Sequence, residues 1–386
     1  MKKNMQKGIV FIGIIATALG LMSIKYKNAN DPVYYSMDEL RKIYSSGNPK
    51  TWPIATVDSN VVNFQDIGPL QKPTHPADNP FSKEKRELGK MLFFDPRLSN
   101  SKQISCASCH DPALAWGDGK PVSHGEDRQK GIRNSKSLLN VAYASPLFWD
   151  GRALTLEDQA RFPVKDPKEM ANHVDVAVKT IKKIKGYQPL FKEAFGDDEI
   201  TEDRIFKAIA TFERTIVSRK SRFDRFVEGD EKQLTDQEIQ GLHLFRTKAR
   251  CINCHNSGYF SDNQFHNLGL TYYKRKYEDL GLYAQTNNPS DVGKFRTPSL
   301  RDVKFTGPYM HNGLFPNLRG VLNMYNAGMP NRKLPESAKN DPTYPVNSNL
   351  LEVLNLNEEE LQALEAFLGA ISSTVYREPE PEALPK

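Results

Sequence analysis

Two short segments contain all four cysteines of the 386-residue chain, and both segments have the same spacing. Residues 106–110 read CASCH, and residues 251–255 read CINCH. A Cys-x-x-Cys pair can form a disulfide or redox pair, provide half of a zinc site, or attach a haem covalently. These are the three kinds of chemistry that the segments could perform, and each must also explain the histidine that follows the pair.

That histidine distinguishes the three kinds of chemistry. A redox pair does not need it, and Cys106 and Cys251 lie farther apart in the chain than two halves of one zinc site usually do. In haem attachment, the two thiols bond the vinyl groups of the porphyrin, and the adjacent histidine ligates the iron. We therefore predict two covalently bound haem c groups. The residues that hold them are Cys106, Cys109 and His110 for the first haem, and Cys251, Cys254 and His255 for the second.

The N-terminal segment indicates export. Residues 1–8 (MKKNMQKG) are positively charged, and residues 9–22 form an apolar run of signal-peptide length, shorter than most membrane-spanning helices. The small residues ATA at 16–18 are a candidate cleavage site. Because thioether-linked haem is assembled outside the bacterial cytoplasm, we predict a periplasmic protein. The sequence leaves open whether residues 1–30 are a cleaved signal peptide or an N-terminal membrane anchor.

The net charge of +6 does not indicate an acidic partner, because it is concentrated at the N-terminus. The first 30 residues contain five lysines and no acidic residue, which leaves a net charge of +1 for residues 31–386. The rest of the chain has no long basic run and no nucleic-acid motif. We therefore predict no nucleic-acid binding.

Helical periodicity predominates in the elements that must position the two Cys-x-x-Cys-His segments. Four segments with apolar residues at helical spacing are expected to form helices: residues 82–95, residues 202–217, the segment that begins at Thr235, and the segment that begins at Asn357. The last two begin with a capping box, with Glu238 and Glu360 at the third helical position. Few stretches alternate with a period of two, so we predict a mainly α fold.

The fold is expected to contain two cytochrome c-like domains, each around one covalently attached haem. The predicted order is a signal peptide or anchor (1–30), an extended lead-in (31–80), an N-terminal haem domain (81–230), a C-terminal haem domain (231–376) and a tail (377–386). The tail is acidic and rich in proline, which predicts either an extended strap or a disordered end.

Two longer blocks add a family resemblance. Residues 123–170, which include SHG, FWDGR and LEDQA, and residues 296–318, which include RTPSLRD and YMHNG, resemble the signature regions of the bacterial dihaem cytochrome c peroxidase family. This family also contains the MauG-type enzymes. The resemblance covers residues 82–376 and implies a peroxidatic N-terminal haem and an electron-transfer C-terminal haem.

The resemblance implies roles for four side chains in the first block. His124 matches the removable sixth ligand of the N-terminal haem, and Trp149 matches the tryptophan between the two haems. Gln159 and Glu169 match the residues of the distal pocket where peroxide binds. A carboxylate such as Glu169 can take a proton from one peroxide oxygen and return it to the other.

The resemblance also implies a calcium ion between the domains. Its ligands would be Asn134 and the backbone oxygens of Thr306 and Pro308. His266 and His311 are expected to be structural hydrogen-bonding residues near the second haem, not iron ligands.

At the sixth ligand of the C-terminal haem, the chain does not match the peroxidases of the family. Peroxidases of the family use a methionine there, and MauG-type members use a tyrosine. The position falls on Tyr325, with Met324 beside it and Met329 four residues later. Thioether sulfur favours Fe(II) and phenolate oxygen favours Fe(III). His124 therefore indicates a peroxidase and Tyr325 a MauG-type enzyme.

The leading hypothesis is an exported dihaem cytochrome c peroxidase that reduces hydrogen peroxide to water. Its electrons would come from a small cytochrome c or a cupredoxin. The alternative is a MauG-like oxidase that uses peroxide to oxidise a protein or an organic substrate, and a third hypothesis is a non-catalytic dihaem electron carrier. The sequence determines neither the donor nor whether the chain forms a homodimer.

Overall fold

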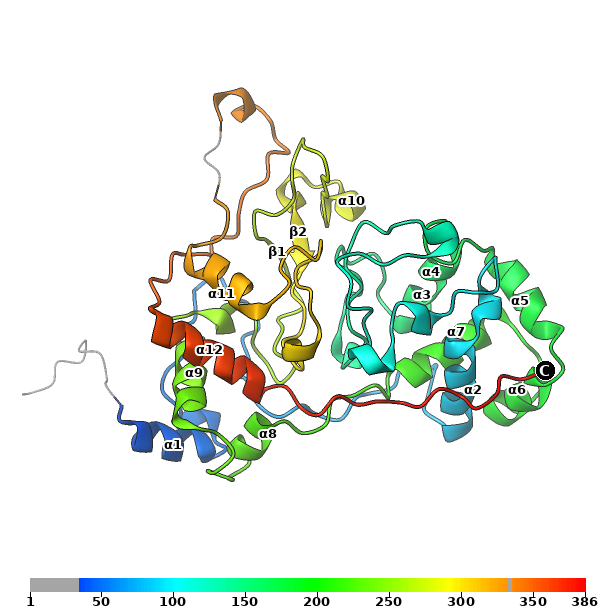
Figure 1. Ribbon diagram of the computed structural model, residues 1–386, viewed down its shortest axis with the longest axis horizontal. Coiled ribbons are helices and arrows are strands. Elements are labelled where there is room, and N and C mark those ends of the chain that lie inside the picture. Colours follow the sequence, from blue (N-terminus) through cyan, green and yellow to red (C-terminus); the bar gives the residue numbers. More distant parts are fainter. Residues whose placement is uncertain (1–34, 332–334) are drawn as a thin grey trace, which may run out of the picture. The chain divides into compact units, whose positions relative to one another are not determined.

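Helices and long loops account for almost all of the structure, a computed structural model that describes residues 35–331 and 335–386 (Figure 1). Residues 37–386 form one compact unit. The predicted leader, residues 9–22, lies outside the described residues. Within the described ranges, no helix has both the length and the apolar character needed to cross a membrane.

Twelve α-helices and one two-stranded sheet are found in the described residues, and the prediction of a mainly helical fold is confirmed. The helices are α1 (Met37–Ser45), α2 (Lys83–Phe94), α3 (Leu156–Gln159), α4 (Arg161–Lys165), α5 (Val174–Lys182), α6 (Tyr187–Phe195), α7 (Glu202–Glu213), α8 (Arg222–Val227), α9 (Asp236–Arg246), α10 (Tyr283–Thr286), α11 (Leu318–Asn326) and α12 (Glu358–Ala370). Strand β1 (Phe265–Asn267) pairs antiparallel with β2 (Lys294–Arg296), with His266 opposite Phe295.

The four helices predicted from apolar spacing are present as α2, α7, α9 and α12. Both predicted capping boxes form, because the side chains of Thr235 and Asn357 accept hydrogen bonds from the backbones of Glu238 and Glu360. Helix α7 ends at Glu213, four residues before the predicted end. Helix α1 lies within the segment expected to be an extended lead-in, and its residues Leu40 and Tyr44 are buried.

Two helix pairs, α2 with α7 and α9 with α12, cross in the same way. A Cβ atom on Gly89 of α2 would lie 1.9 Å from the Ala208 carbonyl oxygen of α7. A Cβ atom on Gly241 of α9 would lie 1.9 Å from the Ala363 carbonyl oxygen of α12. Only glycine permits so close an approach of two backbones. Each pair leads to one of the two Cys-x-x-Cys-His segments, since α2 precedes the first segment and α9 precedes the second. The domain boundary near residue 230 stays a prediction.

The chain after α12 forms an extended segment, residues 372–386, which we call the C-terminal strap. In Figure 1 the strap, drawn in red, leaves α12, runs past α2 and ends beside α6. Lys90 of α2 forms an ion pair with Glu378, and the backbone N–H of Gly186 donates to the Lys386 oxygen at 2.7 Å. Of the two alternatives for the tail, the structure therefore has the strap.

Candidate functional site

A cavity of about 830 Å³ lies between the two Cys-x-x-Cys-His segments. Its wall includes Cys109 and His110 of the first segment and Cys251, Cys254 and His255 of the second. Leucine, valine and aromatic side chains form much of the remaining wall. The volume is at the upper end of the range for small-molecule and cofactor sites.

The two segments have the same backbone turn. The first turns through the 3₁₀ helix η3 (Cys106–Ser108), and the second through η7 (Cys251–Asn253). The backbone N–H of His110 donates to the Cys106 carbonyl at 3.0 Å, and that of His255 donates to the Cys251 carbonyl at 2.9 Å. This turn places both thiols and the imidazole of each segment on one short loop.

Both histidines are oriented by a backbone carbonyl. The Nδ1 atom of His110 lies 3.1 Å from the Trp116 carbonyl oxygen, and Nδ1 of His255 lies 3.1 Å from that of Phe260. Burial lowers the pKa of both imidazoles. A neutral imidazole that donates its Nδ1–H to a carbonyl keeps the Nε2 lone pair for a metal ion. This is the arrangement expected of an iron ligand.

The cysteines also fit covalent attachment of haem. All four are unpaired and half-buried. Burial raises the pKa of the Cys109 thiol to about 11 and that of the Cys251 thiol to about 12. Protonated thiols are poor metal ligands and poor redox nucleophiles. The donor set at each end of the cavity, two thiols and one neutral imidazole, therefore fits a haem c group.

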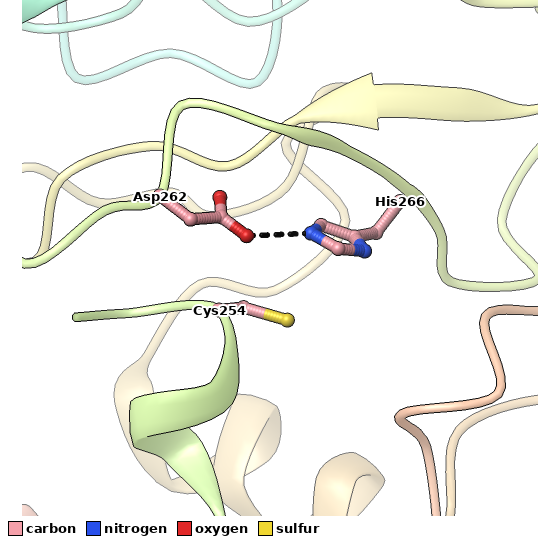
Figure 2. A group of neighbouring side chains, drawn as sticks. All are labelled: Cys254, Asp262 and His266. Atoms are coloured by element: carbon pink, nitrogen blue, oxygen red, sulfur yellow. Dashed lines mark hydrogen bonds and ion pairs between the residues drawn. The ribbon is translucent and has the colours of Figure 1, made fainter. Parts of the chain in front are cut away.

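A competing use of Cys254 would be a metal site with Asp262 and His266 (Figure 2). The three donor atoms lie within 4.8 Å of one another, and His266 Nε2 is 2.8 Å from Asp262 Oδ2. Against burial, which lowers it, the hydrogen bonds to Asp262 and Cys254 raise the pKa of His266 to about 10. The bond to Asp262 already occupies the His266 nitrogen that a metal ion at this position would need. The hydrogen-bonding role expected for His266 agrees with this geometry.

Glu169 and Gln159 both line the cavity, as the resemblance predicts. Gln159 is the last residue of α3, and Glu169 lies in the loop between α4 and α5. Burial and the nearby charge of Asp166 raise the pKa of Glu169 to about 7, although Arg152 acts in the opposite direction. A carboxyl group with a pKa near 7 exchanges protons readily at neutral pH.

His124 is not brought to the cavity wall. Its side chain is exposed on the loop 123–131, and it is not among the lining residues. The loop nevertheless contacts the backbone beside Glu169, because the Glu126 N–H donates to the Glu169 carbonyl at 2.8 Å. A Cβ atom on Gly125 would lie 2.3 Å from the same carbonyl oxygen. The role of His124 as a removable ligand therefore stays a prediction.

Trp149 is 9% exposed and lines the cavity. Its indole N–H donates to the Asn134 carbonyl at 2.9 Å, which fixes the plane of the ring. The ring of His311 meets Trp149 edge-on, with the ring centres 6.3 Å apart. His311 in turn stacks on Phe295, with the ring centres 3.6 Å apart. His311 therefore contacts both aromatic rings, and the hydrogen-bonding role expected for it stays a prediction.

Lys136 is a functional candidate that the sequence analysis missed. Its Nζ atom lies 3.9 Å from the centre of the Trp149 ring and 3.2 Å from the Phe148 carbonyl oxygen. Burial lowers the pKa of Lys136 well below its usual range, and Arg296 and Arg133 lower it further. A lysine in the segment RNSKSLL gave no signal of its own, because its contact with Trp149 depends on the fold.

Arg133 connects the first sequence block to Asp279, which lies outside both blocks, and was also missed. It forms ion pairs with Asp150 at 2.6 Å and with Asp279 at 2.7 Å, and all three residues are largely buried. Its guanidinium group also lies over Phe295, 5.7 Å from the ring centre. The buried charges of this group are therefore paired, as buried charges usually must be.

The three predicted calcium ligands line the same cavity. The side-chain amide of Asn134 donates to the Lys120 carbonyl at 2.8 Å, and the backbone carbonyl of Asn134 accepts from the Trp149 indole N–H. Thr306 and Pro308 lie on the loop that follows the 3₁₀ helix η9 (Val303–Phe305). Calcium binding by these residues stays a prediction.

Of the three candidates for the sixth ligand of the second haem, Tyr325 lines the cavity, and Met324 and Met329 are not among the lining residues. Tyr325 lies on α11. Burial raises the pKa of the Tyr325 hydroxyl, and the nearby Cys254 and Cys251 raise it further. The hydroxyl is therefore close to the second pair of thiols.

The turn that holds His110 has an unusual backbone. Ala115 and Trp116 have φ angles of 55° and 62°, in the left-handed region. Each such non-glycine residue costs about 1–2 kcal/mol, so tertiary contacts must hold the turn. Trp116 is fully buried and packs edge-on against Phe93, with the ring centres 5.9 Å apart. The sequence analysis did not identify this residue.

Comparison with known proteins gives a consistent result. Residues 83–232 match the family described as di-haem cytochrome c peroxidase. The chain is 38% identical over 351 residues to cytochrome-c peroxidase IdrP1 of Denitromonas iodatirespirans, which covers 83% of this chain and 90% of the relative. It is 40% identical over 294 residues to methylamine utilization protein MauG of Methylophilus methylotrophus, which covers 75% of this chain and 83% of the relative.

Solved structures agree with these relatives. A MauG-like protein associated with microbial copper homeostasis superposes with a TM-score of 0.71 at 32% identity, over 82% of this chain and 95% of that chain. The diheme peroxidase BthA from Burkholderia thailandensis superposes with a TM-score of 0.64 at 25% identity, over 86% of this chain and 98% of that chain.

Proposed function

Because the chain belongs to the di-haem cytochrome c peroxidase family, which includes MauG, we propose that it reduces hydrogen peroxide to water with electrons from a small cytochrome c or a cupredoxin. The cavity is the observation on which the proposal rests, because it is lined by both histidines, by Glu169 and by Trp149. Relatives named cytochrome-c peroxidase support a peroxidase-type oxidoreductase.

Two haem groups, attached at the four cysteines and ligated by His110 and His255, would supply the iron that binds peroxide and the capacity to store electrons. The role of the chain is to attach these groups, to orient both imidazoles through backbone carbonyls, and to line the cavity between them largely with apolar side chains. Reduction of one peroxide to two waters consumes two electrons and two protons, so the chain must also provide proton and electron routes.

Glu169 is proposed as the acid/base group. Its ionised carboxylate accepts a proton from one oxygen of peroxide and returns it to the other, which leaves as water. The pKa of about 7 suits both halves of this exchange, since neither transfer is strongly uphill at neutral pH. The Gln159 amide, on the same wall, is proposed to orient peroxide by a hydrogen bond.

Trp149 is proposed as the aromatic group through which electrons pass between the two ends of the cavity. Its ring plane is fixed by the Asn134 carbonyl, and its π system lies on the cavity wall. A fixed aromatic ring can accept and release an electron with little movement of its surroundings. Lys136 and His311 are the neighbours that determine the environment of the ring.

A second candidate function is favoured by Tyr325. Because Tyr325 lines the cavity and the two methionines do not, a phenolate is the better candidate ligand at the second iron. Phenolate favours the oxidised metal, which suits a MauG-like enzyme that uses peroxide to oxidise a side chain of another protein or an organic substrate. The relative named MauG is as similar to the chain as the relative named peroxidase.

The periplasm is the proposed location, because residues 1–22 have the pattern of an export signal and haem c is assembled there.

The two functions share the peroxide site and differ in the source of the electrons. Catalysed oxidation of a reduced small cytochrome c or cupredoxin by peroxide supports the first. Slow oxidation of both donors, with a long-lived near-infrared band after peroxide addition, supports the second. No spectral response to peroxide would contradict both and leave the electron carrier.

A further inference from the structure

The carbonyl that orients His110 belongs to a residue whose side chain is bonded to the C-terminal strap. The Trp116 carbonyl oxygen lies 3.1 Å from Nδ1 of His110. The Trp116 indole N–H donates to the Tyr376 carbonyl at 2.8 Å, and the rings of these two residues are nearly parallel, with their centres 6.3 Å apart. Trp116 therefore connects the strap to the first predicted iron ligand.

The turn at Trp116 depends on contacts from outside. Ala115 and Trp116 both have left-handed backbone angles, which are unfavourable for residues other than glycine. Inside the turn, the Trp116 N–H donates to the Asp111 carbonyl at 2.8 Å. The indole is enclosed by Phe93 and Phe212, and its polar atom is bonded to the strap. The position of the Trp116 carbonyl is therefore determined partly by the strap.

The strap is firmly attached to the helices around the first Cys-x-x-Cys-His segment. Glu378, which is 8% exposed, forms ion pairs with Arg86 at 2.6 Å and Lys90 at 2.9 Å, and accepts a hydrogen bond from the Tyr376 hydroxyl. The Arg97 guanidinium donates to the Pro385 carbonyl at 2.9 Å. Ion pairs between largely buried groups resist displacement, because breaking one leaves an uncompensated charge.

The other end of the strap continues from α12, which packs against α9, the helix that precedes the second segment. Leu364 and Leu368 of α12 are lining residues. Just after the helix, the N–H and hydroxyl of Ser373 donate to Asp302 Oδ1 at 2.7 and 3.0 Å. A short run of chain thus leads from the cavity wall at α12 to the carbonyl that holds His110.

We propose that Trp116 and the C-terminal strap are a positioning device for His110. The strap fixes the Trp116 carbonyl, and this carbonyl fixes the strength and direction of the hydrogen bond from His110 Nδ1–H. An imidazole that donates a stronger Nδ1–H hydrogen bond is a stronger donor at Nε2 and stabilises the oxidised metal. The inference rests on the proposed function, because the acceptor of Nε2 is a haem iron.

The test compares two tryptophan variants of the exported, haem-loaded protein. Trp116→Phe keeps the ring and removes the N–H that bonds the strap. Trp52→Phe is the matched control, because Trp52 is 5% exposed and its buried indole nitrogen has no hydrogen-bond partner in the described residues. Resonance Raman spectroscopy measures the iron–histidine stretching frequency, and a spectroelectrochemical titration measures the midpoint potential of each haem.

In Trp116→Phe we expect a weaker His110 hydrogen bond, a lower iron–histidine frequency and a higher midpoint potential of the first haem. At the wild-type midpoint, the ratio of reduced to oxidised first haem should rise about twofold to tenfold, the range for one hydrogen bond. The second haem and the Trp52→Phe protein should be unchanged. Glu378→Gln, which loosens the strap without touching Trp116, should shift the first haem in the same direction by a smaller amount.

Unchanged frequency and midpoint in Trp116→Phe would overturn the positioning role. Equal shifts in Trp52→Phe would also overturn it, because they would trace to general loosening of the fold. The mass of the purified chain, measured first, distinguishes failure of the proposed function from failure of the positioning role. A chain without haem overturns both proposals, whereas an unchanged midpoint in a two-haem protein overturns only the positioning role.

Discussion

Replacing Glu169 by glutamine tests the proposed acid/base group most sharply. The substitution keeps the shape of the side chain and removes its ability to exchange a proton. In the wild type, burial and the charge of Asp166 raise the pKa of Glu169 to about 7. At neutral pH about half of the molecules therefore have the carboxylate that accepts the proton.

The expected loss of peroxide turnover is about 10²- to 10⁴-fold, the usual contribution of a positioned acid/base group. In the wild type, turnover should fall as pH decreases below 7, by about tenfold per pH unit, because the ionised carboxylate is the active form. The glutamine variant should lose this dependence. The loss of turnover and the loss of the pH dependence both come from removal of the ionisable carboxyl group, so they should appear together.

Glu169→Gln lowers turnover, but it should not lower the stability of the fold. The rise of the Glu169 pKa from 4.5 to about 7 corresponds to about 3 kcal/mol in favour of the protonated form in the folded state. A carboxyl group with a folded pKa above its unfolded pKa stabilises the fold below pH 4.5, and this contribution is lost as pH rises through 7. Because glutamine cannot ionise, the variant should be at least as stable as the wild type at pH 8.

The assay follows donor oxidation by peroxide between pH 5 and 8, with denaturant unfolding at pH 8. Glu193→Gln, an exposed change on α6, is the matched control and should match the wild type. Near-normal turnover of Glu169→Gln would remove Glu169 from the mechanism. A large loss of turnover with lower stability at pH 8 would indicate damage to the fold, and would contradict the argument from the pKa.

Three further substitutions test other parts of the account. Trp149→Phe should lower the free energy of unfolding by about 1 kcal/mol, because the Asn134 carbonyl loses its donor, and stopped-flow mixing should show slower electron delivery from the donor to peroxide. Tyr325→Met should raise the midpoint potential of the second haem, because thioether sulfur favours Fe(II), and an unchanged midpoint in a redox titration would exclude Tyr325 as a ligand. Arg301→Met should cost about 3–5 kcal/mol in denaturant unfolding at pH 7, because Asp224 would keep a buried charge without its partner. Against burial, Arg301 lowers the pKa of Asp224 below 3.8, so in the wild type the stabilisation by this pair should be lost as pH falls below 3.8.

The sequence predicted well where the signal is local. The Cys-x-x-Cys-His spacing singled out two segments whose residues line the cavity. The capping boxes at Thr235 and Asn357 located the starts of two helices that the structure confirms. The resemblance placed Glu169 and Trp149, both of which line the cavity. These features depend on residues that are close together in the chain, or on blocks long enough to be matched.

The sequence predicted poorly where contact depends on distant residues. Trp116 and Tyr376 are 260 positions apart, and no local pattern links them. Met324 and Tyr325 are adjacent on α11 and point about 100° apart, so only the rotation of the helix in the fold decides which one lines the cavity. Lys136 lies in the segment RNSKSLL, and only the fold brings it over Trp149, which is 13 residues later in the chain.

The most direct test of the central claim is the mass of the denatured protein, purified from a host that exports the chain and assembles haem c. Denaturation removes any group that is not covalently attached. The account predicts the mass of the polypeptide plus two haems, and the loss of one haem when Cys106 and Cys109 are both replaced by alanine. A mass equal to that of the polypeptide alone, or an unchanged mass in the double variant, would contradict it.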